Sequence, residues 1–363
     1  MRICLIGKNL TNLVLANVLA NKKLYLDIYY NNSLIPQKNR SSRTLALSYK
    51  NYGFLKENSK NFNLLAWPTE SIKIYVEKKK LEELFEFKNN NQNNFFLVKY
   101  NEIYNFYLNS LKKNKYIRFI KLKNNNDKLF YKKNYNLIIN SDFNSYISRK
   151  FFYKKIEKNY NSHAYTFLIY HKKIKNNISM QIFTKKGPLA FLPLSNNKTS
   201  IVFSYKSLNK IQFKEIKKIL KNFNDKYKIT RFGKVENFNL RFSMLRNYCH
   251  DNILSFGDLI HKIHPLAGQG FNMTIRDIKI LSKIIDEKIS LGLEINNSVG
   301  ENFEKRVKHL NFIYGSGVDL IYNFFNLDNK LNNSLSDPLF KIFKKNKILN
   351  KYATYFSDRG INI

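Results

Sequence analysis

The first thirty residues constrain the fold more than any other part of the chain. An apolar run, Arg2–Ile6, ends at Gly7, and apolar residues at helical spacing follow between positions 10 and 18. A second apolar run, Leu24–Tyr30, comes directly after them. Strand, glycine turn, helix and strand in this order form the opening βαβ unit of a nucleotide-binding sheet.

The rest of the chain alternates between strand and helix signals. Further strands are expected at Ile72–Val76, Phe95–Val98, Ile117–Lys121, Tyr135–Asn140 and Asn252–Phe256, and helices at Ile103–Leu111 and Lys214–Tyr227. Residues 162–205 alternate in strand fashion, with a tight turn at Gly187. The pattern predicts an α/β nucleotide-binding domain interrupted by a mostly antiparallel β insertion, followed by a helical tail from about Val299.

The formal net charge of +37 has three explanations. The one we favour is AT-rich codon usage, which enriches Lys and Asn on solvated faces. Attraction to an anionic membrane surface comes second. Nucleic-acid binding comes last, because the basic residues are spread along the chain without a zinc-finger spacing or an aromatic RNA-binding motif.

The cysteine content and the lengths of the apolar runs indicate in which cellular compartment the protein lies. The two cysteines, Cys4 and Cys249, predict no disulfide framework. The first residues lack the order of a signal peptide, and no stretch approaches the roughly 18 consecutive apolar residues of a membrane span. We expect a cytoplasmic protein, either soluble or attached peripherally to the inner face of the membrane.

The segment 257–272 carries the functional inference. A strand ends in Gly257-Asp258, a loop punctuated by Pro265, Gly268 and Gly270 follows, and a helix begins. Glycines let a backbone approach a flat ligand closely, and the unpaired N–H groups of a first helical turn suit a ligand oxygen that gains negative charge. Asp258, just past the end of a strand, is placed to accept hydrogen bonds from sugar-alcohol hydroxyls.

This segment resembles the flavin-proximal motif of the ubiquinone-biosynthesis FAD-dependent hydroxylases, which are para-hydroxybenzoate-hydroxylase-like flavoprotein monooxygenases. Twelve residues match the pattern of the family: Gly257, Asp258, His261, His264, Pro265, Ala267, Gly268, Gln269, Gly270, Asn272, Arg276 and Asp277. The stretch from Arg43 to Ser48 and the strand Gly187–Leu194 are similar to two further family segments. The first contains an arginine near the cofactor, and the second faces the flavin from the substrate domain.

The resemblance implies a fold, a domain organisation and a set of cofactor-binding residues. The fold is a Rossmann-like FAD-binding domain with an interleaved antiparallel β-sheet substrate domain and a C-terminal helical region. The FAD domain would comprise 1–60, 99–150 and 250–300, the substrate domain 61–98 and 151–249, and the helical region 301–363. The implied cofactor-binding residues are Gly7, Arg43, Gly257, Asp258, Pro265, Gly268, Gln269, Gly270, Phe271 and Asn272.

The sequence departs from the family pattern mainly at the adenosine end. The glycine fingerprint of the first turn retains Gly7, but Asn9 and Asn12 replace its second and third glycines. No carboxylate stands at the end of the second strand, where Tyr30 and Asn31 lie, and Asp27 comes about three residues too early. The second Asp-Gly motif becomes Asp142-Phe143, and Leu259 and Ile260 replace two small alanines.

Several of these residues have a simpler explanation. His261 and His264 lack the partners of a metal site, so we expect loop structure or hydrogen bonding near the cofactor, and no metal. For Asp142 two interpretations remain: a contact with the cofactor, or an exposed aspartate in a turn. For the Arg276-Asp277 dipeptide, too, two interpretations remain: part of the family motif, or a pair of charged residues on the surface.

By resemblance, FAD reduced by NAD(P)H or another electron donor would activate O2 for hydroxylation of a polyprenyl phenol. Since the cofactor carries that chemistry, no catalytic nucleophile or acid–base pair is expected. The basic surface and the segment Pro338–Tyr355 would help the chain dock at a membrane. The alternative is a flavin-poor homologue that acts as a scaffold among other ubiquinone-synthesis proteins. No nucleic-acid partner is expected.

Overall fold

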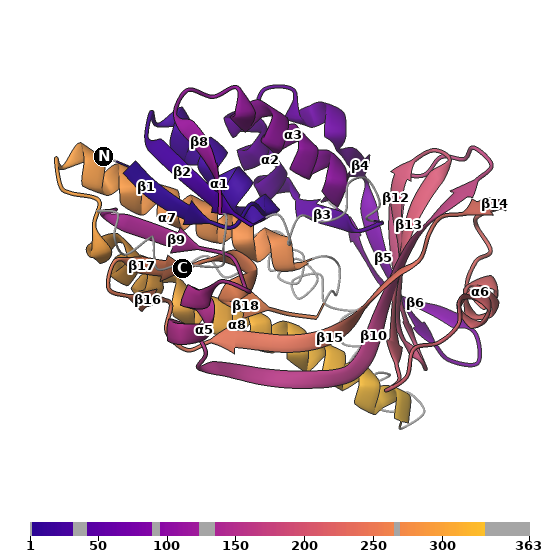
Figure 1. Cartoon of the computed structure of the whole chain (residues 1–363). Helices are drawn as coiled ribbons and strands as arrows, with labels where there is room; N and C mark the ends of the chain where they lie inside the picture. Colours follow the sequence, from indigo (N-terminus) through magenta and orange to yellow (C-terminus); the bar gives the residue numbers. More distant parts are fainter. Residues whose placement is uncertain (1, 32–41, 89–94, 123–134, 265–268, 331–363) are drawn as a thin grey trace.

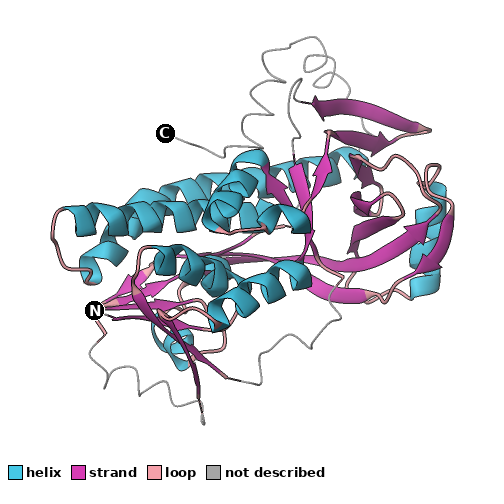
Figure 2. Ribbon diagram, turned by 90° about the horizontal axis from the view of Figure 1, so that it is seen from above, coloured by secondary structure: helices cyan, strands magenta, loops and turns pink. Residues whose placement is uncertain are grey.

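The computed structural model describes residues 2–31, 42–88, 95–122, 135–264 and 269–330. A parallel sheet with its helices forms the part that contains the N-terminus, and a large, mostly antiparallel sheet forms the other part (Figure 1). Figure 2 shows the same arrangement from above, with most helices over the first part.

The first sheet has six strands in the order β16-β17-β9-β1-β2-β8, and all pairs are parallel except β16 with β17. The strands are β1 (Arg2–Ile6), β2 (Tyr25–Tyr30), β8 (Ile117–Lys121), β9 (Leu137–Asn140), β16 (Cys249–His250) and β17 (Ile253–Ser255). Ile6 pairs with Asn140, which in turn pairs with Ser255. The segments that follow these three strands therefore meet at one edge, although they lie far apart in sequence.

Most helices accompany this sheet. They are α1 (Leu10–Asn21), α2 (Tyr49–Asn58), α3 (Tyr100–Lys112), α5 (Tyr146–Phe151), α7 (Gln269–Ser290) and α8 (Asn297–Lys330), with the 3₁₀ turns η2 (Phe62–Leu65) and η3 (Gly257–Leu259). Every α1 residue from Leu10 to Ala20 is buried, because α1 contacts β2, α3, α7 and α2. A helix enclosed in this way is apolar on most sides.

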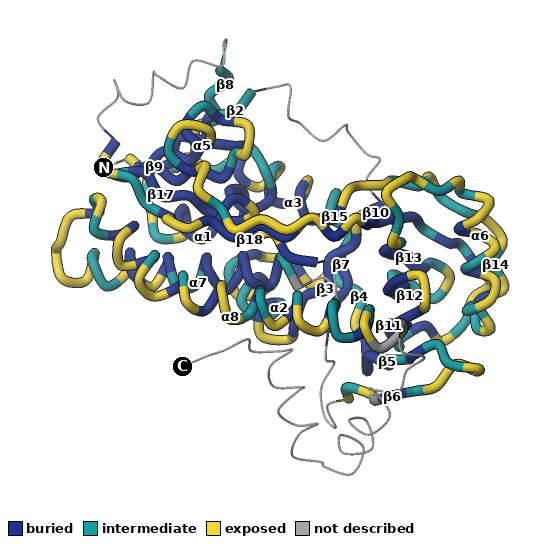
Figure 3. Tube along the Cα trace, turned by 90° about the horizontal axis from the view of Figure 1, so that it is seen from below, coloured by how far each residue is buried: buried dark blue, intermediate teal, exposed yellow. Residues whose placement is uncertain are grey.

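The second sheet has nine strands in the order β18-β15-β10-β13-β12-β11-β5-β6, with β14 on β10. They are β5 (Ser71–Glu77), β6 (Leu81–Lys88), β10 (Lys155–His171), β11 (Ile178–Thr184), β12 (Gly187–Ser195), β13 (Lys198–Lys206), β14 (Ile229–Phe232), β15 (Glu236–Leu245) and β18 (His261–Lys262). Helix α6 (Phe213–Asn222) inserts Ile216 and Leu220 into its aromatic core, and its outer side is exposed (Figure 3).

A small antiparallel sheet, β3-β7-β4, lies between the two parts. Its strands are β3 (Thr44–Ser48), β4 (Trp67–Thr69) and β7 (Phe95–Lys99). Strand β3 contacts α7, while β7 and β4 contact β12 of the large sheet. The small sheet therefore connects the cofactor-side helices with the large sheet.

Helix α8 packs against both parts. Phe303 and Val307 belong to the core under the parallel sheet, whereas Val318 and Tyr322 belong to a core beside the large sheet. The helical region was predicted over 301–363, and the helix begins a turn earlier. The segment Pro338–Tyr355 lies outside the described residues. Within the described ranges, no helix is long and apolar enough to cross a membrane.

Most predicted elements agree with the structure, although α3 begins at Tyr100, three residues earlier than predicted, and a second helix is shorter than predicted. Strand β1 is confirmed at both ends, and β2, β5, β7, β8, β9 and β17 fall within two residues of their predicted bounds. The helix predicted over 214–227 ends at Asn222. Beyond it, the side chain of Asn224 bonds both the N–H and the carbonyl of Tyr227, which makes a turn instead of another helical turn.

Candidate functional site: a cleft at the carboxyl ends of the parallel strands

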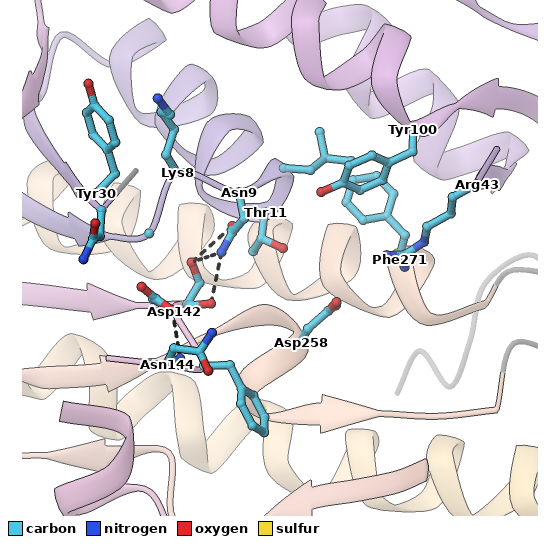
Figure 4. A pocket seen from close by; sticks show the side chains of 15 residues that line it. Lys8, Asn9, Thr11, Tyr30, Arg43, Tyr100, Asp142, Asn144, Asp258 and Phe271 are labelled. Atoms are coloured by element: carbon cyan, nitrogen blue, oxygen red, sulfur yellow. Dashed lines mark hydrogen bonds between the residues drawn. The ribbon is translucent and has the colours of Figure 1, made fainter. Parts of the chain in front are cut away.

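A cavity of about 260 Å³ opens where the carboxyl ends of β1, β9 and β17 meet (Figure 4). It is lined by the β1–α1 turn (7–11), the end of β2 (30–31), the loop after β9 (141–144), Arg43, Tyr100, Asp258 and Phe271. In open parallel sheets, ligands bind outside the carboxyl ends of the strands. This position therefore identifies the cavity as the candidate site.

The structure brings four of the predicted cofactor-binding residues to this cavity: Gly7, Arg43, Asp258 and Phe271. Gly257, Gly270 and Asn272 lie in the surrounding framework and do not line it. Pro265 and Gly268 fall outside the described residues, as does the side chain of Gln269 at the start of α7. The contact of these residues with a cofactor stays a prediction.

Gly7 makes the turn from β1 into α1. Its φ of +105° belongs to a region that L side chains rarely adopt. A Cβ there would come within 3.2 Å of Asn9 Nδ2 and of Asp142 Cβ. Gly7 therefore keeps the turn tight and the floor of the cavity open.

Asn9 and Asn12, which replace two glycines of the fingerprint, form side-chain hydrogen bonds within the protein. Asn9 Oδ1 accepts from the Asn12 N–H at 3.1 Å, and Asn9 Nδ2 donates to the Ser141 carbonyl and hydroxyl. Asn12 Nδ2 donates to the carbonyls of Ile6 and Gly7 at 2.8 Å each. The two amides thus stabilise the turn that glycines make in the family pattern, and they join it to the loop after β9.

Gly257 lets the turn after β17 pack directly on the first turn of α1. Its φ is +64°, and a Cβ would stand 2.6 Å from Thr11 Cγ2 and 2.9 Å from Thr11 Oγ1. A side chain at position 257 would therefore clash with Thr11, which is itself buried. This contact places Asp258, which is exposed, at the rim of the cavity.

We expect Gly257→Ala to lower the free energy of unfolding by about 2–4 kcal/mol, which combines left-handed strain with overpacking against Thr11. Gly53 in α2 provides the control, because nothing lies within 4 Å of a Cβ at that position. Gly53→Ala should be neutral or stabilise the protein by about 0.5–1 kcal/mol. Urea denaturation measures both, and equal effects of the two substitutions would contradict this packing.

Asn272 binds the two family segments to each other. Its Oδ1 accepts from the Ser48 N–H at 3.1 Å and from Asn51 Nδ2 at 3.0 Å, while its Nδ2 donates to the Ala46 carbonyl at 2.8 Å. The side chain is therefore fully engaged with β3 and the start of α2. It fixes the start of α7 against the segment that follows Arg43.

Two cations and two carboxylates line the cavity. Lys8 Nζ lies 3.7 Å from the centre of the Tyr30 ring, and burial, assisted by the charge of Lys112, lowers the Lys8 pKa. The Arg43 guanidinium lies 5.2 Å from the centre of the Tyr100 ring. Burial raises the pKa of the Asp142 carboxyl, although the Asn144 N–H and Arg149 oppose the shift. Asp142 thus lies in the cavity wall, half-buried, instead of on an exposed turn.

The cavity residues that were not predicted include Lys8, Ser141 and Tyr100. Lys8 stands at a variable position of the fingerprint, and Ser141 directly precedes Asp142. Their positions beside these motif residues are the signal that could have indicated both. Tyr100 carries no such signal. It begins α3, and it reaches the cavity because its N–H bonds to the Arg43 carbonyl at 2.9 Å.

The two histidines of the motif have different surroundings. His261 Nε2 donates to Asp277 Oδ2 at 2.9 Å, so this histidine does form a hydrogen bond, while its nearness to a cofactor stays a prediction. The ring of His264 stacks on Tyr322 with centroids 4.1 Å apart, and burial lowers its pKa to about 3. Within the described ranges, no group of three or more metal-ligating side chains occurs.

Comparison with known proteins agrees with this geometry. Residues 157–290 match the family described as "FAD binding domain". A mitochondrial ubiquinone biosynthesis monooxygenase COQ6 from Dictyostelium discoideum is 28% identical over 183 residues, which are 40% of this chain and 37% of that protein. The 3-demethoxyubiquinol 3-hydroxylase of Escherichia coli is 32% identical over 154 residues, which are 40% of this chain and 39% of that protein.

These matches make the chain a distant relative of the ubiquinone-biosynthesis FAD-dependent hydroxylases. The aligned region spans about two fifths of the length of these curated relatives. The fold agrees over a larger share of the chain. The crystal structure of pqsL, a probable FAD-dependent monooxygenase from Pseudomonas aeruginosa, covers 93% of this chain and 99% of its own at a TM-score of 0.70 and 13% identity.

The cavity fits part of FAD, the cofactor of the matched domain family. The Asp258 carboxylate could accept hydrogen bonds from a ribityl chain, and the cradle at Gly7, which a Cβ would fill, leaves room for a phosphate. The adenosine end fits poorly, because the strand β2 ends in Tyr30 without a carboxylate. The residues therefore suit the flavin half better than the adenosine half.

Proposed function

We propose that this chain is an FAD-dependent monooxygenase that hydroxylates the aromatic ring of a polyprenyl phenol in ubiquinone biosynthesis. In the overall reaction a ring C–H becomes C–OH, the second oxygen atom of O2 leaves as water, and NAD(P)H or another donor supplies the electron pair. Bound flavin would supply the activation of O2. The observation that carries the proposal is the cavity itself, where Asp258 and Arg43 come together from two family segments that Asn272 connects.

The residues of the chain would bind and orient the cofactor and exclude water. Asp258 would accept hydrogen bonds from the ribityl hydroxyls, and Arg43 with the first turn of α1 would offset the phosphate charge. We place the cofactor-binding domain at 1–60, 99–150 and 250–300, around the parallel sheet, and the substrate domain at 61–98 and 151–249.

The substrate side would be formed by β12 and the small sheet. Ala190 and Leu192 of β12 pack with Ala46 of β3 and Leu97 of β7 in one apolar cluster. Ala46 is also the residue whose carbonyl Asn272 binds, so this cluster adjoins the start of α7. An apolar wall beside the flavin segment suits a phenol that carries a hydrocarbon chain.

Product analysis tests the proposal. Flavin-loaded protein, NAD(P)H and a short-chain polyprenyl phenol in labelled O2 should give a hydroxylated product that carries one labelled oxygen atom. If the protein binds flavin yet yields no labelled product with any such phenol, the proposed reaction is wrong.

We also propose a peripheral contact with anionic lipid through the basic surface and the segment Pro338–Tyr355. Vesicle sedimentation that is unchanged after deletion of this segment would count against that contact.

A further inference from the structure

The two ends of the cavity offer different chemical groups. Asp258 and Arg43 lie toward one end, and Lys8 and Tyr30 lie side by side at the other (Figure 4). In dinucleotide-binding sheets, a carboxylate at the end of the second strand accepts hydrogen bonds from the adenosine ribose. Here that strand ends in Tyr30, and the carboxylates that line the cavity, Asp142 and Asp258, follow other strands.

Asp27, the acidic residue of the second strand, cannot take the place of the missing carboxylate. It is fully buried, and Arg118 donates to its two oxygens at 2.7 Å each. The Tyr135 hydroxyl donates to it at 2.7 Å and Arg2 at 3.2 Å. Protein donors therefore occupy its acceptor sites, and Asp27 does not line the cavity.

In the turn between β1 and α1, a backbone N–H group is already hydrogen-bonded to a side chain of the protein. In a glycine fingerprint, the N–H groups of this turn bind the pyrophosphate. Here the Asn12 N–H bonds to Asn9 Oδ1. Fewer donors remain for two phosphates, and the positive charge of the lining comes from the side chains of Lys8 and Arg43.

We infer that this chain holds flavin through its ring, ribityl chain and first phosphate, and that flavin mononucleotide binds about as tightly as FAD. The adenosine half of FAD finds neither the ribose carboxylate nor a full set of turn donors, so it adds little to affinity. The inference rests on the proposed function, since both place a flavin in this cavity. It goes further by stating which part of the cofactor the chain recognises.

Titration of the apoprotein with riboflavin, flavin mononucleotide and FAD tests the inference, with quenching of flavin fluorescence as the signal. We expect dissociation constants for the two nucleotides within about threefold of each other, and riboflavin roughly tenfold weaker because it lacks the charged phosphate. FAD binding more than about tenfold tighter than flavin mononucleotide would overturn the inference and leave the proposed function standing. If none of the three flavins binds, the proposed function is wrong as well.

A substitution at the end of β2 provides a second test. Tyr30→Glu places a carboxylate where the ribose would lie, so FAD should bind roughly tenfold tighter while the affinity for flavin mononucleotide stays the same. Tyr153→Glu is the matched control, because Tyr153 is 63% exposed and outside this cavity. It should change neither affinity. If Tyr30→Glu folds and the ratio of the two affinities stays unchanged, adenosine does not lie at this end and the inference fails.

Discussion

Replacing Asp277 with alanine is expected to lower the free energy of unfolding by about 3–5 kcal/mol, because it leaves buried donors without their acceptor. Asp277 is fully buried in α7 and accepts from His261 Nε2 and Arg276 Nη2 at 2.9 Å each. Asn311 of α8 donates to it at 3.3 Å and also accepts from Arg276. The carboxylate therefore connects β18, α7 and α8 at one point.

The matched control is Asp286→Ala on the same helix. Asp286 forms an exposed pair with Lys22 at 2.6 Å, and such pairs contribute roughly 0–1 kcal/mol. Urea denaturation of both variants gives the comparison. Losses of equal size would show that Asp277 is not the centre of this network.

The effect of Asp277→Ala should also depend on pH. Burial pushes the pKa of Asp277 upward, but Arg276 and His261 outweigh burial and hold the pKa below its ordinary value. A carboxyl whose pKa is depressed by folding contributes stability above its unfolded pKa, near 4, and that contribution is lost as the pH falls. The difference between wild type and variant should therefore narrow below about pH 4. A difference that widens in acid would contradict this assignment.

Replacing Asp258 with alanine is expected to weaken flavin binding roughly tenfold to a hundredfold with little change in stability. A hydrogen bond to a charged group contributes about 1.5–3 kcal/mol, which corresponds to this range of affinity. Asp258 is exposed in the cavity, so its removal leaves no buried group without a partner.

Fluorescence titration and a thermal melt measure these two effects on the same samples. Asp225→Ala is a suitable control, since Asp225 is exposed and does not line the cavity. If Asp258→Ala leaves the affinity for flavin unchanged, this carboxylate does not contact the cofactor.

Local patterns predicted the features that depend on short stretches of chain. The βαβ unit was predicted from the apolar run before Gly7, the helical spacing of apolar residues after it and the second apolar run. Such patterns are local properties of the sequence. Gly257-Asp258 was placed correctly at the end of a strand for the same reason. The missed strands β6 and β15 are rich in charged and polar residues, and their pairing partners, not their composition, make them strands.

The surroundings of single side chains could not be predicted in this way. Asn9 finds its partner, Ser141, 132 residues away, so nothing near the turn indicates that its side chain forms this hydrogen bond. Of the two alternatives left open for Arg276 and Asp277, the surface pair is excluded, because both side chains are buried and α8 contacts Asp277. Tyr100 reaches the cavity only through its pairing with the segment of Arg43.

The visible absorption spectrum of the purified protein, recorded before and after addition of FAD and flavin mononucleotide, tests the central claim most directly. The claim is that the cavity at Gly7, Arg43 and Asp258 holds a flavin. We expect flavin bands that approach one flavin per chain, either as purified or after reconstitution. A colourless protein that neither flavin restores would contradict the claim, and a flavin-free scaffold among ubiquinone-synthesis proteins would then be the better account.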